Sequence, residues 1–301
     1  MEQRYVQRAV KAYNNEDFLH SGAARPVRIM AEYLSPEQQF RKHGIHNAII
    51  VFGSARIRSA EQFQYEYSIL KKHLEQATDG ERPDVERSIT LLKKQWEMTQ
   101  YYNDTVELCG MLTEWSKHLP RNKRFVICSG GGSGIMEAAN RGATIAGGES
   151  VGLNISLPYE QFPNPYITPD LHFEFHYFFM RKFWFAYLAK AMIVCPGGFG
   201  TLDEFMEILT LRQTEKLAGR LPIVLYGSKF WKRVLDFNYL ADMGLIEEND
   251  LNLYHYADTP REAFDFITAQ LTEIYHLRFA ALPGDGANGR RERSGDDRKH
   301  G

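Results

Sequence analysis

Short runs of apolar residues alternate along the chain with longer stretches in which apolar residues recur at helical spacing. Three of these runs, Ala48–Phe52, Phe125–Cys128 and Ala191–Cys195, contain no polar side chain other than a terminal cysteine. Because they lack alternating polar positions, they predict strands that are buried on both faces of a sheet. Further strands are expected at Val151–Ile155, His172–His176, Pro222–Tyr226 and Leu253–Tyr256.

Helical stretches are predicted before, between and after these strands. The segment 77–87 (ATDGERPDVER) is polar and rich in turn-forming residues, and it predicts a loop. Two short helical segments with a break around Ser21–Pro26 precede the first strand. The other helices are expected at about 59–76, 88–118, from the first glycine turn through Gly142, and at 179–190, 202–215, 229–243 and 261–279.

The repeated order of strand, glycine turn and helix predicts an α/β protein. Its core would be a doubly wound parallel sheet with helices on both faces. Ligands of such sheets bind beyond the carboxyl ends of the strands. We expect an N-terminal helical extension at 1–45 and a single α/β domain at 46–280. Residues 281–301 are almost devoid of apolar side chains, so we expect a disordered tail there.

Composition narrows the class of protein. The formal net charge of the 301 residues is −2, which argues against a protein that binds nucleic acid through many phosphate contacts. No stretch approaches the roughly 20 apolar residues of a membrane span, and the polar N-terminus lacks the apolar core of a signal peptide. Cys109, Cys128 and Cys195 are odd in number and widely spaced, as in reduced thiols. We therefore expect a cytoplasmic protein without a membrane or nucleic-acid partner.

Two glycine-rich loops follow predicted strands: Ser129–Gly134, here called loop 1, and Pro196–Thr201, called loop 2. Glycine lets the backbone turn sharply and bring its N–H groups close to a ligand. The helix that follows each loop adds free N–H donors and the positive end of its dipole, which suits an anion. One such loop is as well explained by a tight turn. Two at strand ends of one sheet favour an anion-binding site.

Common phosphate-binding patterns do not fit either loop. A Walker loop requires Gly-Lys-Ser/Thr, and neither loop contains that lysine. The dinucleotide pattern G-x-G-x-x-G fails because Ile135 occupies the third glycine position counted from Gly130. The two loops therefore favour neither ATP nor NAD chemistry.

Charged side chains are predicted beside loop 2. Asp203 and Glu204 are expected in the first turn of the next helix, where a carboxylate commonly stabilises the helix dipole by roughly 0.3–1 kcal/mol. This role accounts for Asp203. Glu204, if it faces the crevice, would suit a substrate that develops positive charge in an oxocarbenium-like transition state. The pair Arg181 and Lys182 lies in an aromatic helix upstream and is either a solvated helix face or part of the same site.

Four segments of the sequence resemble motifs of the Lonely Guy (LOG) family. Members of this family are cytokinin riboside 5′-monophosphate phosphoribohydrolases, long described as possible lysine decarboxylases. Pro196–Glu204 resembles the P-G-G-x-G-T-x-x-E signature, and Met180–Lys182 resembles the Arg-Lys element upstream of it. Gly130–Asn140 resembles the first glycine loop of the longer bacterial members, and Phe52–Arg56 the opening strand and turn. The resemblance covers about residues 46–275.

The resemblance implies a Rossmann-like fold and hydrolysis of the N-glycosidic bond of a nucleoside 5′-monophosphate, which yields free base and ribose 5-phosphate. It implies that Arg181 and Glu204 are catalytic, that no metal or cofactor is needed, and that the protein is a dimer or larger homo-oligomer whose active sites draw on a neighbouring subunit. Phosphate-binding or substrate-binding roles carry over to Gly197, Gly198, Gly200, Thr201, Lys182 and Thr210, with Ser54, Gly131, Gly132 and Glu160 as further candidates.

In the corresponding mechanism, loop 2 amides and Thr201 anchor the phosphate, since charge-assisted hydrogen bonds are about twice as strong as neutral ones. Remote binding energy then orients the ribose. Glu204 stabilises the oxocarbenium ion or aligns the water, and Arg181 holds either the ribose or the carboxylate. The group that protonates the departing base is not visible in the sequence.

Two other functions stay open at this stage. A lysine decarboxylase would need pyridoxal phosphate on a Schiff-base lysine, for which Lys182 and Lys190 are available although no pattern singles out either. A nucleotide-sensing protein would keep the pocket without turnover. The extension at 1–45 and the insertion around 77–87 exceed the compact plant-type members, so the sequence leaves open the assembly state and the choice between AMP and a cytokinin nucleotide.

Overall fold

A computed structural model describes residues 8–157, 162–217 and 219–277. In this part of the chain, seven strands form a single sheet in the order β4-β3-β2-β1-β5-β6-β7, and every neighbouring pair is parallel. The predicted doubly wound α/β fold is confirmed. The strand bounds lie within two residues of the predicted ones: β1 Ala48–Phe52, β2 Val126–Ser129, β3 Ser150–Ile155, β4 His172–Phe175, β5 Ala189–Val194, β6 Ile223–Tyr226 and β7 His255–Ala257.

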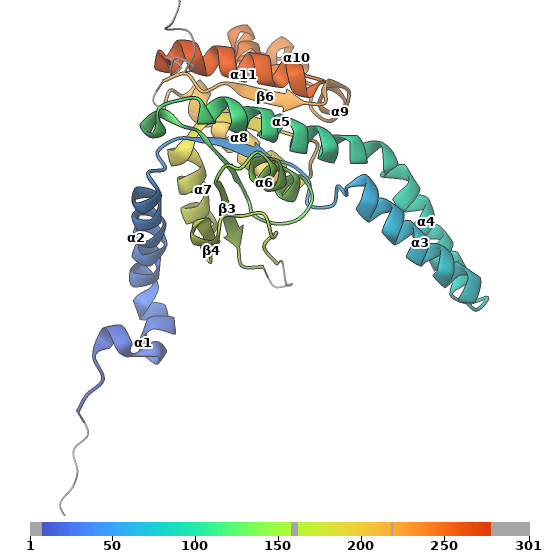
Figure 1. Ribbon diagram of the computed structural model, residues 1–301, viewed down its shortest axis with the longest axis horizontal. Coiled ribbons are helices and arrows are strands. Elements are labelled where there is room, and N and C mark those ends of the chain that lie inside the picture. The colour runs from blue at the N-terminus through green and yellow to red at the C-terminus, as the bar shows by residue number, and fades with distance from the viewer. Residues whose placement is uncertain (1–7, 158–161, 218, 278–301) are drawn as a thin grey trace, which may run out of the picture.

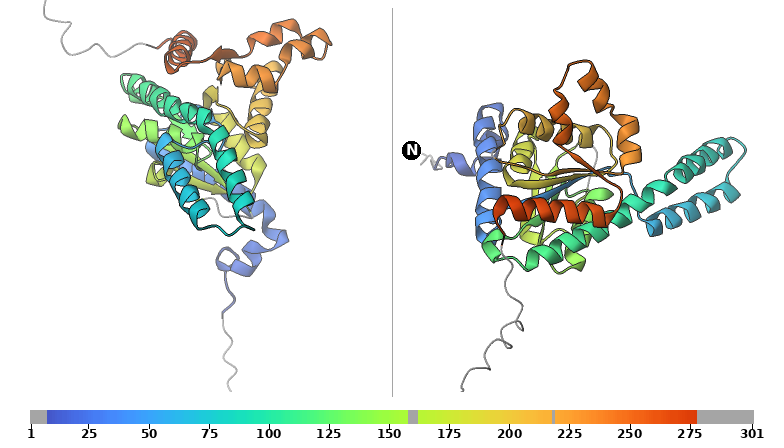
Figure 2. Two further views of the ribbon diagram at one scale, coloured as in Figure 1. Left: turned by 90° about the vertical axis from the view of Figure 1, so that its right-hand side faces the viewer. Right: turned by 90° about the horizontal axis from the view of Figure 1, so that it is seen from above.

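Helices cover both faces of the sheet (Figures 1 and 2). The α-helices of the described residues are α1 Glu16–His20, α2 Arg25–His43, α3 Ala60–Gln76, α4 Arg82–Lys94, α5 Thr99–Lys117, α6 Ile135–Ile145, α7 Phe178–Leu188, α8 Phe199–Gln213, α9 Ser228–Val234, α10 Phe237–Asp242 and α11 Pro260–Tyr275. Short 3-10 helices occur at Ala12–Asn14, Gly22–Ala24, Trp96–Met98, Arg121–Lys123, Pro169–Leu171 and Glu248–Asn252.

The sheet separates two hydrophobic cores. Successive side chains of a strand point to opposite faces, and in β1 Ile50 and Phe52 enter one core while Ile49 and Val51 enter the other. The first core is closed by α2, α7, α8 and α9, and the second by α5, α6 and α11. Because every residue of β1 is buried, this strand needs apolar side chains at all five positions. This explains why the sequence shows an unbroken apolar run there.

The region between β1 and β2 differs from its prediction. Residues 77–87 were expected to form a loop and 88–118 one long helix, whereas α4 begins at Arg82 and α5 at Thr99, with a 3-10 turn between them. α4 packs against α3, and the two helices project from the body as a hairpin (Figures 1 and 2). The chain must turn at Trp96–Met98 because α5 returns to the face of the sheet.

Helices α3 and α4 pack chiefly against each other, and we call this hairpin the arm. Its inner side is apolar, with the ring of Phe63 in α3 4.8 Å from that of Trp96, which follows α4 in the chain. The Pro83 ring at the start of α4 is compatible with the first turn of a helix, where no N–H partner is required. Pro83, which contributed to the prediction of a loop, thus lies in the first turn of a helix.

Two further helices depart from their predictions. The expected helix at 229–243 is interrupted at Leu235–Asp236, because the Asp236 side chain accepts a hydrogen bond from the Tyr239 N–H (3.0 Å) and begins α10. The expected helix at 261–279 ends at Tyr275. The predicted tail at 281–301 lies outside the described residues. None of the helices in the described ranges is long and apolar enough to cross a membrane.

Candidate functional site

The crevice at which the strand order reverses lies between β1 and β5, since β2 to β4 extend from one side of β1 and β5 to β7 from the other. Three loops meet at the carboxyl ends of these strands. The N–H of Ser54, which follows β1, donates to the Pro196 carbonyl of loop 2 (3.0 Å), and the Ser54 carbonyl accepts from the Ile135 N–H behind loop 1 (3.1 Å). This is the position at which open α/β sheets bind ligands.

Loop 2 leads into α8 with free backbone donors. The first amide of this helix to find a backbone acceptor is that of Leu202, which donates to Gly198 (3.0 Å). No protein acceptor among the described residues is recorded for the amides from Gly198 to Thr201, and Gly198 at the N-cap has no side chain that could serve as one. Thr201 is buried beside Gly197, at which a Cβ would lie 2.1 Å from the Thr201 Oγ1. The end of α8 therefore offers N–H groups and positive dipole to an anion.

Loop 1 is built differently, because its backbone is enclosed by protein. The Gly131 and Gly132 carbonyls both accept hydrogen bonds from the Asn164 side chain (3.0 Å each). A Cβ on Gly131 would lie 1.8 Å from the Asn154 Oδ1, and one on Gly134 would lie 2.3 Å from the Ser54 carbonyl oxygen. Gly131 and Gly134 of loop 1 are thus required by packing.

Arg181 of α7 and Glu204 of α8 face each other in a largely buried position. The Arg181 Nη2 lies 3.2 Å from the Glu204 Oε1, and the two side chains are 13% and 4% exposed. The guanidinium also lies over the rings of Phe178 and Phe185. Its Nε is buried with no hydrogen-bond partner among the described residues. A buried ion pair of this kind is costly to desolvate, which makes it weak as a stabilising device and points to a chemical role.

Burial has opposite effects on the two partners. It raises the pKa of Glu204 above the ordinary 4.5, while the positive charges of Arg181 and Lys182 oppose this rise. It also lowers the pKa of the Arg181 guanidinium, which the Glu204 carboxylate opposes. Each group therefore helps to keep the other ionised in a poorly hydrated place.

Lys182 is held by three carboxylates of α8. Its Nζ lies 2.8 Å from Asp203 Oδ2, 2.7 Å from Glu207 Oε2 and 3.6 Å from Glu204 Oε2. Burial lowers the pKa of Lys182, but the hydrogen bonds to Asp203 and Glu207 outweigh this effect and the net shift is upward. Lys182 is therefore a cation that orders the carboxylates around Glu204.

The position of these carboxylates corrects the sequence interpretation. Asp203 and Glu204 were expected in the first turn of their helix, but α8 begins at Phe199 and places both in its second turn. The dipole effect falls off within the first turn, so helix capping does not explain Asp203. The ion pair with Lys182 explains the position of Asp203 instead.

Residues 136–267 match the family model described as "Possible lysine decarboxylase". The match includes α7, loop 2 and α8, and thus Arg181, Lys182 and Glu204. This description is the earlier name of the LOG family, so the segment is similar to LOG-family proteins. The family resemblance stated from the sequence is confirmed. A comparison with curated proteins finds no match.

Solved structures with a similar chain path include two proteins named for the molybdenum cofactor. The molybdenum cofactor binding protein from the phototrophic bacterium Rippkaea orientalis is 19% identical, with a TM-score of 0.41 over 57% of this chain and 88% of that one. The Moco carrier protein from Chlamydomonas reinhardtii is 17% identical, with a TM-score of 0.41 over 75% of this chain and 98% of that one. Likenesses this weak carry no argument about what this chain binds.

Of the remaining residues implied by the LOG-family resemblance, Ser54 and Thr210 can be placed. Ser54 is at the meeting point of the loops, as described above. Thr210 lies further along α8, where its hydroxyl donates to the Met206 carbonyl (2.7 Å), and it lines an open hollow of about 650 Å³ together with Lys182. Glu160 lies outside the described residues. No cluster of three or more metal-ligating side chains occurs in the described ranges.

Several polar residues at the site were missed from the sequence. Glu207 completes the set of carboxylates around Lys182, one helical turn beyond Asp203 and Glu204. Asn154 and Asn164 shape loop 1 from behind. A signal for Asn154 was present, because it is a polar residue inside the otherwise apolar core of β3. No local signal marks Asn164, which reaches loop 1 from a distant loop.

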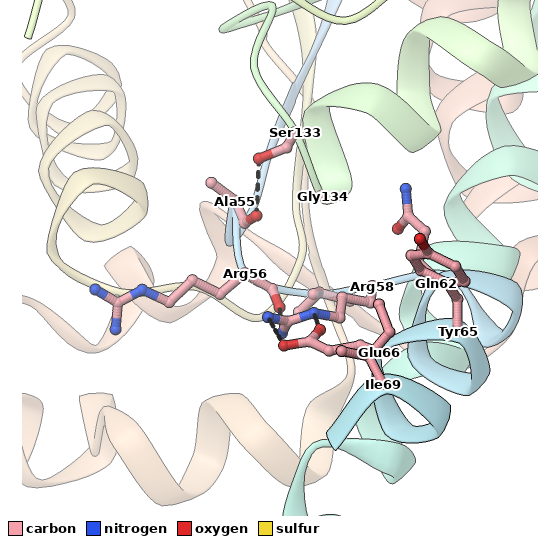
Figure 3. Close-up of a pocket in the computed structure, with 10 residues that line it drawn as sticks. Ala55, Arg56, Arg58, Gln62, Tyr65, Glu66, Ile69, Ser133 and Gly134 are labelled. Atoms are coloured by element: carbon pink, nitrogen blue, oxygen red, sulfur yellow. Dashed lines mark hydrogen bonds and ion pairs between the residues drawn. The ribbon is translucent and has the colours of Figure 1, made fainter. Parts of the chain in front are cut away.

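A second hollow lies on the other side of loop 1, between the β1 loop and the arm (Figure 3). It has a volume of about 490 Å³ and is lined by Tyr65 and Ile69 of α3 and by Ser133 of loop 1, among others. The Arg58 guanidinium at its edge forms an ion pair with Glu66. Neither Arg181 nor Glu204 lines this hollow, so it is separate from the charged cluster.

Proposed function

We propose that the crevice beyond β1 and β5 hydrolyses the N-glycosidic bond of a nucleoside 5′-monophosphate, either AMP or a cytokinin riboside 5′-monophosphate. The products are the free base and ribose 5-phosphate. The observation that carries the proposal is the buried pair of Arg181 and Glu204 beside the uncapped end of α8. An anion site next to a buried carboxylate suits a substrate that carries a phosphate at one end and develops positive charge at the other.

The phosphate binds at loop 2 in this proposal. The amides from Gly198 to Thr201 have no recorded protein acceptor among the described residues, and α8 adds its positive dipole end. Open space around Gly198 and Gly200, where an added Cβ would meet no atom within 4 Å, leaves room for a ligand to approach the backbone. Binding energy from the phosphate then orients the ribose above the charged pair.

Glu204 acts on the reacting carbon. As the bond from C1′ to the base nitrogen breaks, its electron pair leaves with the base and C1′ becomes positive. The Glu204 carboxylate stabilises this charge or aligns the water that adds to C1′. Its burial makes the interaction stronger than it would be in water. The water loses one proton and the departing base gains one, so the reaction needs no other reactant.

Arg181 and Lys182 prepare the carboxylate. Both cations contact Glu204, and they keep it ionised against the cost of burial. Of the two roles left open by the sequence, the contact from the Arg181 Nη2 to Glu204 supports the one in which Arg181 holds the carboxylate.

The decarboxylase function is less well supported by the geometry. A Schiff-base lysine must lose its proton to attack a carbonyl, whereas the carboxylates around Lys182 raise its pKa. Burial lowers the pKa of Lys190, but this residue lies at the start of β5, the opposite end from loop 2. Neither lysine is thus both near loop 2 and ready to act as a nucleophile.

We further propose that the protein works as a homodimer or larger assembly. Phe179, Phe183 and Tyr187 of α7 and Phe199 of α8 are exposed beside the charged cluster, and Phe199 is 91% exposed. Such clustered aromatic side chains are typical of protein interfaces. Light scattering coupled to size-exclusion chromatography measures the assembly state, and a monomer at micromolar concentration contradicts this part of the proposal.

The hydrolase proposal is tested by incubating the protein with AMP and with isopentenyladenosine 5′-monophosphate and measuring free base by chromatography. We expect release of base from at least one nucleotide. Glu204→Gln should lower kcat by about 100-fold to 1000-fold, the range for removing a group that stabilises transition-state charge, while AMP binding persists. Asp203→Asn is the matched control, because Asp203 also contacts Lys182 but is exposed. Nucleotide binding without base release would favour a nucleotide sensor and refute the hydrolase.

A further inference from the structure

We propose that Glu32, in the N-terminal helix α2, is a positioning residue for Arg181. Its carboxylate accepts hydrogen bonds from the backbone just before α7. This backbone segment leads into the first turn of α7, which carries Arg181. The inference rests on the proposed function in so far as Arg181 is taken to act on the substrate. It assigns a role to the N-terminal extension, which lies outside the matched family segment.

The contact is direct and uses both carboxylate oxygens. The Glu32 Oε1 accepts a hydrogen bond from the His176 N–H (2.8 Å), and its Oε2 accepts one from the Tyr177 N–H (3.3 Å). Tyr177 is the N-cap residue of α7 and provides no capping side chain of its own. Glu32 thus supplies, from another helix, a negative charge at the positive end of the α7 dipole.

The same peptide segment leads directly to Arg181. The Tyr177 carbonyl accepts hydrogen bonds from the backbone N–H groups of Met180 (3.1 Å) and Arg181 (3.2 Å). Tyr177 is therefore held at its N–H by Glu32 and at its carbonyl by the backbone of Arg181. A short sequence of contacts runs from Glu32 through Tyr177 to Arg181 and then to the carboxylate of Glu204.

The helix that carries Glu32 is itself held against α7. The Trp184 Nε1–H donates to the Glu32 carbonyl (3.1 Å). The ring of Tyr33 lies 5.6 Å from that of Phe183 and 5.6 Å from that of Trp184, and the ring of Phe40 lies 5.2 Å from that of Trp184. These contacts pack α2 against α7 and fix the position of Glu32 between them.

Displacement of α7 would affect the chemical step more than binding. Loop 2 holds the phosphate independently of α2, whereas Arg181 must lie at the correct place relative to Glu204 and the ribose. A misplacement of about 1 Å at a reacting group costs up to roughly 100-fold in rate. Loss of the Glu32 carboxylate should therefore lower kcat while KM for the nucleotide changes little.

The test compares Glu32→Ala and Glu32→Gln with Glu37→Gln. Glu37 lies on the same helix, but its carboxylate pairs with the exposed Arg41 (2.7 Å) and forms no hydrogen bond or ion pair with α7 among the described residues. We expect kcat to fall by about 10-fold to 100-fold in Glu32→Ala. Glu32→Gln should fall less, because an amide retains one acceptor oxygen. Glu37→Gln should match the unchanged protein. Equal kcat values in Glu32→Ala and the unchanged protein would overturn the inference.

A double-variant cycle separates positioning from general destabilisation. If Glu32 acts through Arg181, then Glu32→Ala should add little further loss to Arg181→Lys, because contacting residues are not additive. Full additivity of the two losses would overturn the inference and leave Glu32 as a stabilising residue only.

A measurement without turnover keeps the two proposals distinguishable. Hydrogen exchange should be faster at the His176 and Tyr177 amides in Glu32→Ala than in Glu37→Gln, whether or not the protein hydrolyses nucleotides. If base release is absent but this exchange increases, the hydrolase proposal fails and the Glu32 contact stands. Unchanged exchange at both amides contradicts the positioning role itself.

Discussion

Loop 1 and loop 2 are both rich in glycine and follow β2 and β5, the two strands that flank β1, yet most of their glycines serve different purposes. In loop 1, Gly131 and Gly134 have φ values of +72° and +67°, and a side chain at either position would collide with protein atoms. In loop 2, Gly198 and Gly200 have φ values outside that region and no atom near an added Cβ. Gly131 and Gly134 of loop 1 are demanded by the fold, whereas Gly198 and Gly200 of loop 2 are not. Gly197 is the exception in loop 2, because a Cβ there would collide with Thr201.

The difference shows how to interpret a glycine-rich loop. A glycine that packing requires tells us about folding alone. A glycine that packing does not require is better explained by something that approaches the backbone from outside, and the free amides of loop 2 support this explanation. Loop 2 therefore carries the stronger functional argument, while loop 1 shapes the wall beside it.

The largest expected effect is on loop 1. Gly134→Ala places a Cβ 2.3 Å from the Ser54 carbonyl at a positive φ, so neither the backbone nor the neighbouring strand end can accept it. We expect a loss of about 3 kcal/mol or more in the free energy of unfolding. Urea denaturation followed by circular dichroism measures this. A loss below about 1 kcal/mol would remove the distinction between the loops.

The complementary change in loop 2 should spare stability and impair binding. Gly198→Ala introduces a methyl group into open space at φ −98° and ψ −152°, which alanine adopts. The free energy of unfolding should change by no more than about 1 kcal/mol, the usual range for an N-cap substitution. KM for AMP should rise about 10-fold, equivalent to roughly 1.4 kcal/mol of lost binding. Unaltered KM would mean that the phosphate does not lie against this loop.

The smallest expected effect is on the pH dependence of kcat. Glu204 must be ionised to stabilise positive charge, and its pKa is raised above 4.5, so kcat should fall on the acid side with a midpoint above pH 4.5. Lys182→Met removes a charge that lowers this pKa, so the midpoint should move to higher pH by up to about one unit. Glu137→Gln, on the helix behind loop 1, is the control. A pH profile that shifts equally in both variants contradicts the assignment of the acid limb to Glu204.

Much of the fold followed from local pattern. Apolar runs such as Ala48–Phe52 predict strands because a doubly covered sheet leaves them no polar neighbours, and the order of strands and helices then restricts the topology. The arm could not be predicted in this way. The apolar positions of α4 pack on α3 rather than on the sheet, and no local pattern states which partner a helix face will choose.

The site was predictable only where a motif marked it. The spacing within loop 2 and α8 drew attention to Glu204, and the Arg-Lys element drew attention to Arg181. The contacts that organise these residues come from elsewhere in the chain. Glu32 and Asn164 occupy segments without a recognisable pattern, and their roles depend on side chains that meet only after folding.

The place of β1 in the sheet also has a consequence for the order of assembly during synthesis. β1 to β4 leave the ribosome first and form one continuous half of the sheet, in which the outer edge of β1 has no partner. Unpaired strand edges are prone to join other chains. Only when β5 is complete does this edge close and bring Pro196 to Ser54. The nascent chain therefore exposes an unpaired, aggregation-prone strand edge at the position where the crevice later forms.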